Sequence, residues 1–273
     1  MHSLPVFDMA GKEKEKISLP KAFDEKVRKD LIQKAVVVEA SKTRQPYASD
    51  PLAGHRTSAH YHGMRHSRYS QMNREMARQK RIHSQGNLNM TARFNPRTRK
   101  GRRAHPPKIE RVWAMKMNQK EHMKALMSAL SATLVKELVT QRGHIITEAK
   151  HVPIVLEDDF QKINKTSEVI ALLMKLGLAQ ELTRCSQKKV RAGRGKMRGR
   201  RYRGKKGPVI IIGKDEGVMK AISNIRGVDV SLAKELKVSM LAPGTQPGRL
   251  AIYTKSAIND MKELGTYGKA KSK

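Results

Sequence analysis

Residues 45–108 have the sequence QPYASDPLAGHRTSAHYHGMRHSRYSQMNREMARQKRIHSQGNLNMTARFNPRTRKGRRAHPPK, in which leucine and isoleucine are rare and valine is absent. No part of it shows the apolar recurrence of a packed helix or the alternation of a half-buried strand. Such a segment buries too little apolar surface to offset the entropy lost when its backbone is ordered. We therefore predict a long extended internal loop at 45–108, carried by a globular body formed by residues 1–44 and 109–273.

The loop is rich in groups that bind polyanions. Arginine and lysine recur along it, and it holds six of the ten histidines together with four aromatic residues, Tyr47, Tyr61, Tyr69 and Phe94. Prolines at 46, 51, 106 and 107 mark its two ends, which predicts a chain that runs out and back. A long insertion of this kind is usually functional or disordered. We expect it to become ordered on a polyanionic partner.

The net charge of the chain, +33 at pH 7, indicates the class of that partner. Self-repulsion at such a charge is relieved when the phosphates of a nucleic acid neutralise it. Cys185 is the only cysteine, so no disulfide framework is expected, and a small buried thiol in a reducing compartment is the simplest interpretation. The sequence shows no apolar run of membrane-spanning length and no signal peptide, which predicts a cytoplasmic protein, or a nuclear one if its source has a nucleus, without a membrane partner.

The rest of the chain alternates between strand-like and helix-like segments. We predict strands at 5–7, 16–19, 152–156, 209–212, 238–241 and 250–253, with a short element at 228–236. Helices are predicted from Asp24 to Thr43, from Asn118 to a stop at Gly143, and at 166–176, 218–225 and 256–264. Such alternation is typical of an α/β fold, here a three-layer α/β/α domain with a mainly parallel sheet.

A second basic segment lies at 188–206, where eleven of nineteen residues are basic, none is acidic and four are glycine. Glycines let a backbone approach phosphates closely, and arginine can bind them with a forked pair of donors. Tyr202 could stack on a base or sugar. The glycines have the spacing G-x-G-x-x-x-G and precede a strand, so they do not form a dinucleotide-binding fingerprint. We predict an Arg/Gly-rich RNA-binding segment.

No pattern in the sequence indicates catalysis or a metal site. His60 and His62 with His66 lack a nearby cysteine or carboxylate and lie among cations that would repel a metal ion. The acidic cluster 157–159 is interpreted as a solvated turn, and no nucleophile with a matching base is evident. We expect neither an enzyme nor a small-molecule substrate.

Five stretches closely resemble a known family. They are RQPYASDPLAGHRTSA (44–59), KGRRAHPPK (100–108), SALSATL (128–134), AGRGKMRGRRYRGKKGPVII (192–211) and KVSMLAPGTQPGRLAIYT (237–254). In this order they resemble the archaeal–eukaryotic type of large-subunit ribosomal protein four. Eukaryotic members carry a long C-terminal extension that this sequence lacks, so the archaeal type is the closer fit.

The resemblance implies a structural component of the large ribosomal subunit that binds and organises large-subunit ribosomal RNA. It implies a loop that lines the peptide exit tunnel beside the protein known as twenty-two and meets the nascent peptide. No cofactor is implied beyond Mg²⁺ as part of the ribosomal RNA. The loop tip maps near 63–69, where the tunnel-lining candidates are Gly63, Arg65, His66 and Arg68. Many relatives have Trp-Gly and a glycine-rich Gly-Arg tip at this place, where this sequence departs from them with Tyr61-His62-Gly63-Met64-Arg65-His66.

The RNA-binding residues that we predict are basic side chains of the loop and of the 188–206 segment, with one tyrosine. They are Arg44, Arg56, Arg74, Arg78, Arg81, Arg93, Arg97, Arg99, Arg102, Arg103, Lys188, Lys189, Arg191, Arg194, Lys196, Arg198, Arg200, Arg201, Tyr202, Arg203, Lys205 and Lys206. The alternative is a nucleic-acid-compacting, chromatin-like protein, which would be expected to show a groove-reading helix or a dimer module. A nucleotide-binding enzyme would need a phosphate loop of the correct spacing.

Overall fold

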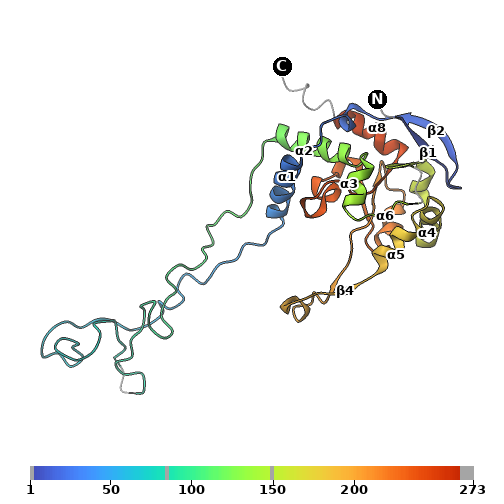
Figure 1. Cartoon of the computed structure of the whole chain (residues 1–273). Helices are drawn as coiled ribbons and strands as arrows, with labels where there is room; N and C mark the ends of the chain where they lie inside the picture. The colour runs from blue at the N-terminus through green and yellow to red at the C-terminus, as the bar shows by residue number, and fades with distance from the viewer. Residues whose placement is uncertain (1–2, 84–85, 148–150, 265–273) are drawn as a thin grey trace. The chain divides into compact units, whose positions relative to one another are not determined.

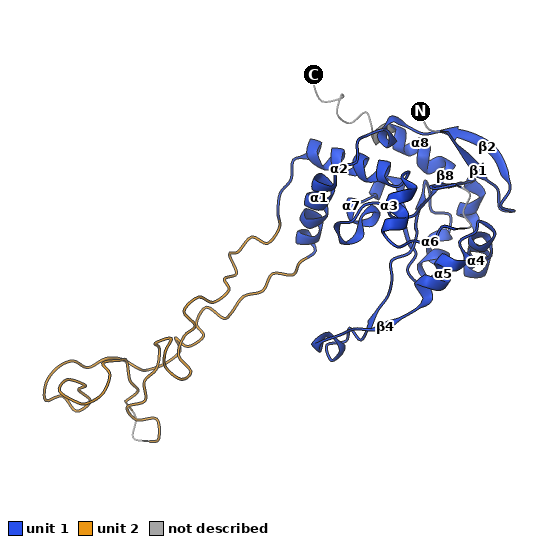
Figure 2. Ribbon diagram, viewed as in Figure 1, with its two compact units in different colours: residues 1–43, 115–273 blue, residues 44–114 orange. Residues whose placement is uncertain are grey.

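The computed structural model describes residues 3–83, 86–147 and 151–264 and divides the chain into two compact units (Figures 1 and 2). We call residues 1–43 and 115–273 the body and residues 44–114 the arm. In the described part of the chain, no helix has the length and apolar character needed to cross a membrane.

The body is built on a six-stranded sheet of order β2-β1-β3-β8-β6-β7. Its strands are β1 (Ser3–Phe7), β2 (Glu13–Ser18), β3 (Ile154–Leu156), β6 (Val209–Ile212), β7 (Asp229–Leu232) and β8 (Ala251–Thr254). β2 pairs antiparallel with β1 at one edge, and the other neighbouring strands pair in parallel. The central strands β3, β6 and β8 are buried along their whole length. This burial on both faces explains why their sequences are mostly aliphatic and do not alternate with polar residues.

Helices cover both faces of this sheet. They are α1 (Lys29–Lys42), α2 (Gln119–Ala132), α3 (Lys136–Gln141), α4 (Thr166–Lys175), α5 (Ala179–Ser186), α6 (Val218–Ser223), α7 (Val238–Leu241) and α8 (Lys255–Leu264). In the described residues, short 3₁₀ turns occur at Lys21–Phe23, Asp158–Lys162, Arg194–Lys196, Ala233–Glu235 and Pro243–Thr245.

Alternate side chains of the central strands enter two separate cores. Ile211 of β6 packs in the core formed with α1, α2, α7 and α8, whereas its neighbours Ile210 and Ile212 pack with α4 and α6. This alternation is the consequence of strand geometry, in which successive side chains point to opposite faces. The predicted three-layer α/β/α domain with a mainly parallel sheet is confirmed.

One predicted strand is wrong, because residues 238–241 form the short helix α7. The carboxylate of Glu39, on α1, accepts hydrogen bonds from the backbone N–H groups of Val238 (3.1 Å) and Ser239 (2.9 Å). These are N–H groups of the first helical turn, which have no partner inside a helix. The cap is supplied by a residue about 200 positions away, so the local sequence does not reveal it.

The long helix predicted from Asn118 to Gly143 is interrupted between α2 and α3. Buried Thr133 donates its hydroxyl to the carbonyl of Leu130 (2.7 Å) and lies 3.1 Å from the Tyr253 hydroxyl. Leu130 belongs to one core and Val139 to the core on the opposite face of the sheet. The break therefore allows one continuous apolar pattern to serve two cores.

The start of one further helix differs from the sequence prediction. The first helix begins at Lys29 and not at Asp24, because the hydroxyl of Ser128 accepts the backbone N–H of Arg28 (2.7 Å) and fixes the helix start there. The short element at 228–236 is the edge strand β7 followed by a 3₁₀ turn.

Candidate nucleic-acid interface

The basic segment 188–206 folds as a two-stranded hairpin. Strand β4 (Lys189–Val190) pairs antiparallel with β5 (Tyr202–Arg203), and the Arg191 N–H continues the ladder to the carbonyl of Arg201 (2.8 Å). A 3₁₀ turn at Arg194–Lys196 forms the tip between them. The glycines therefore shape a turn that carries arginine on both sides.

The stem of this hairpin is fixed to the body by Arg249, whose side chain is fully buried. Its guanidinium donates to the carbonyls of Gly207 (2.8 Å) and Met240 (2.8 Å) and to the carboxylate of Asp229 (2.6 Å). Gly207 lies where the hairpin joins β6, and a Cβ there would come within 2.6 Å of the Cys185 sulfur. The two segments lie so close together here that a side chain at position 207 would require the Cys185 side chain to shift.

A buried carboxylate supports the same stem. Glu181 of α5 accepts hydrogen bonds from Arg184 (2.6 Å) and His144 (2.7 Å), and Arg184 in turn donates to the Lys206 carbonyl (2.8 Å). Burial alone would raise the pKa of Glu181, but these donors lower it to about 2. Burial also raises the pKa of Cys185 to about 11, so this thiol is protonated and unreactive, as expected for a buried cysteine.

The basic side chains of the hairpin are exposed and almost all without an acidic partner. Within the described structure, Lys206 alone of the eleven has a carboxylate partner, Asp229 at 2.9 Å. Lys205 is half-buried, and the other ten basic side chains are exposed. Tyr202 exposes about half of its surface, and Lys188 and Arg201 lie 5.2 and 5.6 Å from its ring centre. The hairpin thus offers an aromatic ring among uncompensated cations.

The arm is a chain that runs out and back, shown in orange in Figure 2. The Ser49 N–H donates to the Pro107 carbonyl (3.1 Å), and farther along the arm His60 and Arg81 exchange backbone hydrogen bonds. At Gly54, where φ is +78°, a Cβ would lie 2.5 Å from the backbone of Arg102. The two legs therefore touch directly at a position that only glycine can occupy.

A cation–π cluster joins the two ends of the arm. Trp113 stacks on Tyr47 with ring centres 5.1 Å apart, and the guanidinium groups of Arg44 and Arg111 lie 4.0 and 4.3 Å from its ring centre. Trp113 and Arg111 are absent from the residues predicted from the sequence. The signal that could have identified them is the chain's single tryptophan, two positions after an arginine.

The tunnel-lining candidates lie in one closed loop, residues 62–71, which the Gln71 N–H closes by donating to the His62 carbonyl (3.1 Å). Gln71 is buried and its side-chain oxygen accepts the Gln79 N–H (3.0 Å). Arg65, His66 and Arg68 are exposed on this loop, and Gly63 is half-buried.

The predicted RNA-binding arginines of the arm fall into two groups. Seven are exposed: Arg44, Arg56, Arg74, Arg78, Arg97, Arg99 and Arg103. The half-buried ones hold the arm together. Arg81 donates to the carbonyls of Met90 (2.8 Å) and Ala77 (3.0 Å), and Arg93 to that of Arg99 (2.6 Å). Arg102 lies 5.9 Å from the ring centre of Phe94.

Carboxylates are scarce in the arm. Over residues 44–83 and 86–114, the one ion pair joins Arg56 to Asp50. The arm therefore leaves most of its positive charge uncompensated within the part of the chain that the structure describes.

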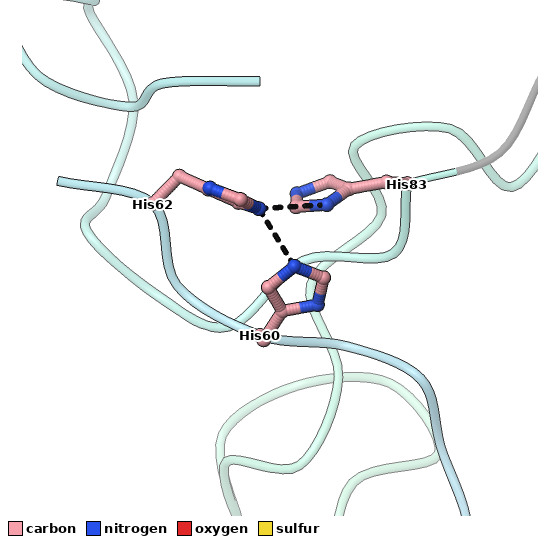
Figure 3. A group of neighbouring side chains, drawn as sticks. All are labelled: His60, His62 and His83. Carbon is pink, nitrogen blue, oxygen red and sulfur yellow. Dashed lines mark hydrogen bonds between the residues drawn. The ribbon is translucent and has the colours of Figure 1, made fainter. Parts of the chain in front are cut away.

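The acidic cluster at 157–159 has structural roles. Asp158 accepts the backbone N–H of Ser256 (2.8 Å) at the start of α8, while Glu157 and Asp159 pair with Lys14 and Lys162. In the described residues, one group has a geometry suited to a metal ion, formed by His60, His62 and His83 (Figure 3). It includes His83 in place of His66, which the sequence had suggested as the neighbour of His60 and His62.

Comparison with known proteins identifies the family. The pattern of the ribosomal protein L4/L1 family matches residues 17–264. The chain is 37% identical to the large ribosomal subunit protein uL4 of Methanosphaera stadtmanae over 265 residues, which cover 97% of this chain and 98% of that protein. It is 41% identical to the protein of the same name from Archaeoglobus fulgidus, over 94% of this chain and 97% of that protein. For the Sulfurisphaera tokodaii protein of that name the identity is 42%, over 94% and 93%. The resemblance found in the sequence is confirmed, and the chain belongs to the ribosomal protein L4/L1 family.

Proposed function

We propose that this chain is a structural component of the large ribosomal subunit that binds and organises large-subunit ribosomal RNA. The relatives bear the name of a large ribosomal subunit protein and align with the chain over nearly their whole lengths. The chain is not an enzyme, in keeping with a family of ribosomal proteins. As part of the ribosome it works in the cytoplasm.

The observation that carries the proposal is the uncompensated charge of the hairpin and the arm. In the body outside the hairpin, many basic side chains pair with carboxylates of the same unit, such as Lys34 with Glu121 (2.6 Å). The hairpin and the arm instead present exposed arginines with few acidic neighbours among the described residues. Phosphate oxygens accept forked hydrogen bonds from arginine, so a folded RNA supplies the missing partner at many points.

Aromatic groups in the same segments suit RNA more than duplex DNA. Tyr202 on the hairpin is exposed and has cations beside it, and single-stranded or looped bases stack on such rings. A protein that reads duplex DNA usually places a helix or a β-ribbon in the major groove. The arm, over its described residues, contains no helix, so shape and phosphate recognition of RNA is the better fit.

The loop 62–71 is proposed to line the peptide exit tunnel, with Arg65, His66 and Arg68 facing the passage. The side chains of Arg65 and His66 make no hydrogen bond or ion pair with any described residue, so they are available to a water-filled space. The proposed neighbours are the ribosomal protein known as twenty-two and, transiently, the nascent peptide. This step rests on the family resemblance together with the exposure of these side chains.

The proposal is tested by sedimentation. Lysate is fractionated on sucrose gradients before and after a high-salt wash, and the chain is followed by immunoblotting. We expect it in the large-subunit fraction under both conditions, because many contacts with a folded RNA act together. Release by the wash, or sedimentation with chromosomal DNA, would contradict the proposal and favour a nucleic-acid-compacting protein.

A further inference from the structure

Three histidines that are distant in sequence are brought to one face of the arm by its backbone pairing. His60 and Arg81 face each other in an antiparallel bridge, with N–O distances of 3.2 and 3.1 Å. Side chains directly opposite one another in such a bridge share a face, as do residues two positions apart on one extended segment. His60, His62 and His83 therefore share one face, although 21 residues separate the last two.

Their rings form a compact triangle (Figure 3). Each pair of ring centres is 4.4 Å apart, and the ring planes are inclined to one another by 45° to 73°. His62 Nε2 lies 2.6 Å from His60 Nε2 and 3.1 Å from His83 Nδ1. The ring of Tyr69 stacks on His83 with ring centres 4.4 Å apart and holds that imidazole in place. One nitrogen of each ring thus points toward a common centre.

Protons alone do not satisfy this arrangement. His60 Nδ1 lies 2.9 Å from the Ser58 carbonyl, to which it must donate, so in the neutral ring His60 Nε2 is an acceptor. His62 Nε2 can donate its proton to only one of its two neighbours. At least one of the two short N···N contacts therefore has no proton of its own when the rings are neutral, and full protonation would set three positive charges side by side.

We propose that His60, His62 and His83 bind a transition-metal ion, with Zn²⁺ the best match. Imidazole nitrogen is a preferred ligand of zinc, copper and nickel, whereas Mg²⁺ prefers oxygen. With Zn–N bonds of 2.0–2.1 Å, tetrahedral ligand nitrogens lie about 3.3 Å apart. The closest nitrogen pair needs to open by less than 1 Å to reach that separation. The bond from His60 Nδ1 to the Ser58 carbonyl is the second contact that orients metal-binding histidines.

This site departs from the expectation drawn from the sequence, which considered His60 and His62 with His66 and found no cysteine or carboxylate nearby. The arginines of the arm lower the affinity for a divalent ion through repulsion, as argued there. Two features offset it. The three imidazoles are neutral ligands that already lie together. A fourth coordination position stays open for water or an oxygen of a bound anion. The proposal does not depend on RNA binding.

The test is a titration of the full chain, without a polyhistidine tag, with Co²⁺, whose visible absorption is strong in tetrahedral and weak in octahedral sites. We expect one equivalent to produce the tetrahedral spectrum and one equivalent of Zn²⁺ to abolish it. Loss of an outer-sphere partner lowers metal affinity ~10- to 100-fold. Loss of a ligand should cost at least as much, so we expect the Co²⁺ affinity of His62→Ala and of His83→Ala to fall by at least that factor. Circular dichroism of each variant checks that the helices of the body are unchanged.

His66→Ala and His105→Ala are the matched controls, because each removes one exposed imidazole of the same arm. Both should bind Co²⁺ as the unsubstituted chain does. Absence of a one-equivalent tetrahedral spectrum would overturn the proposal. Equal weakening in the controls and in His62→Ala would also overturn it, by showing that scattered imidazoles bind the ion without a defined site.

Discussion

The buried arginines of the body and the arginines of the arm are used in opposite ways. In the body, Arg249 is fully buried and donates to four backbone carbonyls at 2.8 to 3.5 Å and to the carboxylate of Asp229. Arg184 is likewise paired with Glu181. In the arm, most arginines are exposed, and those that are half-buried bind carbonyls or aromatic rings instead of carboxylates.

The difference shows where each unit obtains its stability. The body matches its buried cations internally and encloses two apolar cores, so it has what it needs to fold alone. Among the described residues of the arm, the buried ones are Ser70 and Gln71, both polar. Its order must therefore come largely from an external anion. Each of the following predictions either breaks this contrast or makes it more quantitative.

The largest expected effect is in amide hydrogen exchange of the isolated chain. Amides of α2 should be protected up to the global free energy of unfolding, about 5–15 kcal/mol. Residues 48–83 and 86–104 should exchange with little protection, since so few of their side chains are buried. After large-subunit RNA is added, the arm should become protected. Strong protection of the arm without RNA would show that the two units do not differ in this way.

The next effect concerns the buried arginine of the body. Arg249→Leu leaves several buried carbonyls and Asp229 without their donor, and removing one partner of such a network costs about 3–5 kcal/mol. Arg198→Leu, on the exposed hairpin tip, should change stability by no more than about 0.5 kcal/mol. Urea unfolding of the full chain, followed by circular dichroism, measures both. Similar midpoints for the two variants would mean that Arg249 does not hold the stem.

Acid should destabilise the body through Glu39, which caps α7. Burial acts to raise the pKa of Glu39, but hydrogen bonds from His122 and Ser239 and from the N–H groups of Ser239 and Val238 lower it to about 2. Since this folded-state pKa lies below the unfolded value of 4.5, its contribution is present above pH 4.5 and is lost as pH falls toward 2.

The measurement is the free energy of unfolding of the full chain from pH 7 to pH 2. Glu39→Gln should lower stability at pH 7 and flatten the decline between pH 4.5 and 2, a contribution of about 3 kcal/mol at most. Glu168→Gln, an exposed carboxylate on α4, serves as the control and should stay close to the unsubstituted chain. An equally steep decline in Glu39→Gln would assign the acid sensitivity to other groups.

The hairpin should supply affinity through phosphate contacts. Replacing Arg198, Arg200 and Arg201 with alanine should flatten the salt dependence of RNA binding by about one unit per lost contact. The matched control replaces Arg28, Lys34 and Lys124 with alanine, which removes the same positive charge. In the native chain these three side chains pair with carboxylates of the body. Filter binding to large-subunit RNA from 50 to 200 mM salt compares them. An unchanged slope in the hairpin variant would place the RNA-binding surface elsewhere.

The sequence predicts the fold well where the physical cause is local. Aliphatic runs such as Val209–Ile212 identify the buried strands, and the lack of apolar periodicity identifies the arm. It fails where the cause is distant. The carboxylate of Glu39 turns 238–241 into a helix, and the pairing of His60 with Arg81 brings His83 into a group that the sequence assigned to His66. The high arginine content of 188–206 predicts the hairpin as a binding segment. The sequence does not distinguish exposed arginines from those, such as Arg81, that hold the arm together through hydrogen bonds.

The smallest effect on RNA binding is expected at the loop 62–71. The comparison here is between two groups of exposed side chains of the arm. If Arg65, His66 and Arg68 face a water-filled tunnel, their alanine variant should assemble into large subunits with normal yield, because exposed charges in high dielectric contribute ~1 kcal/mol or less. Its effect should appear when the tunnel is occupied, as altered stalling at a tunnel-sensing peptide or altered macrolide sensitivity.

The matched variant replaces Arg97, Arg99 and Arg103, which are exposed on the same arm and are proposed to bind RNA. That variant should lose assembly yield while the surviving ribosomes stall normally. If the variant at 65, 66 and 68 loses assembly and leaves stalling unaltered, this loop braces RNA and the tunnel proposal is wrong.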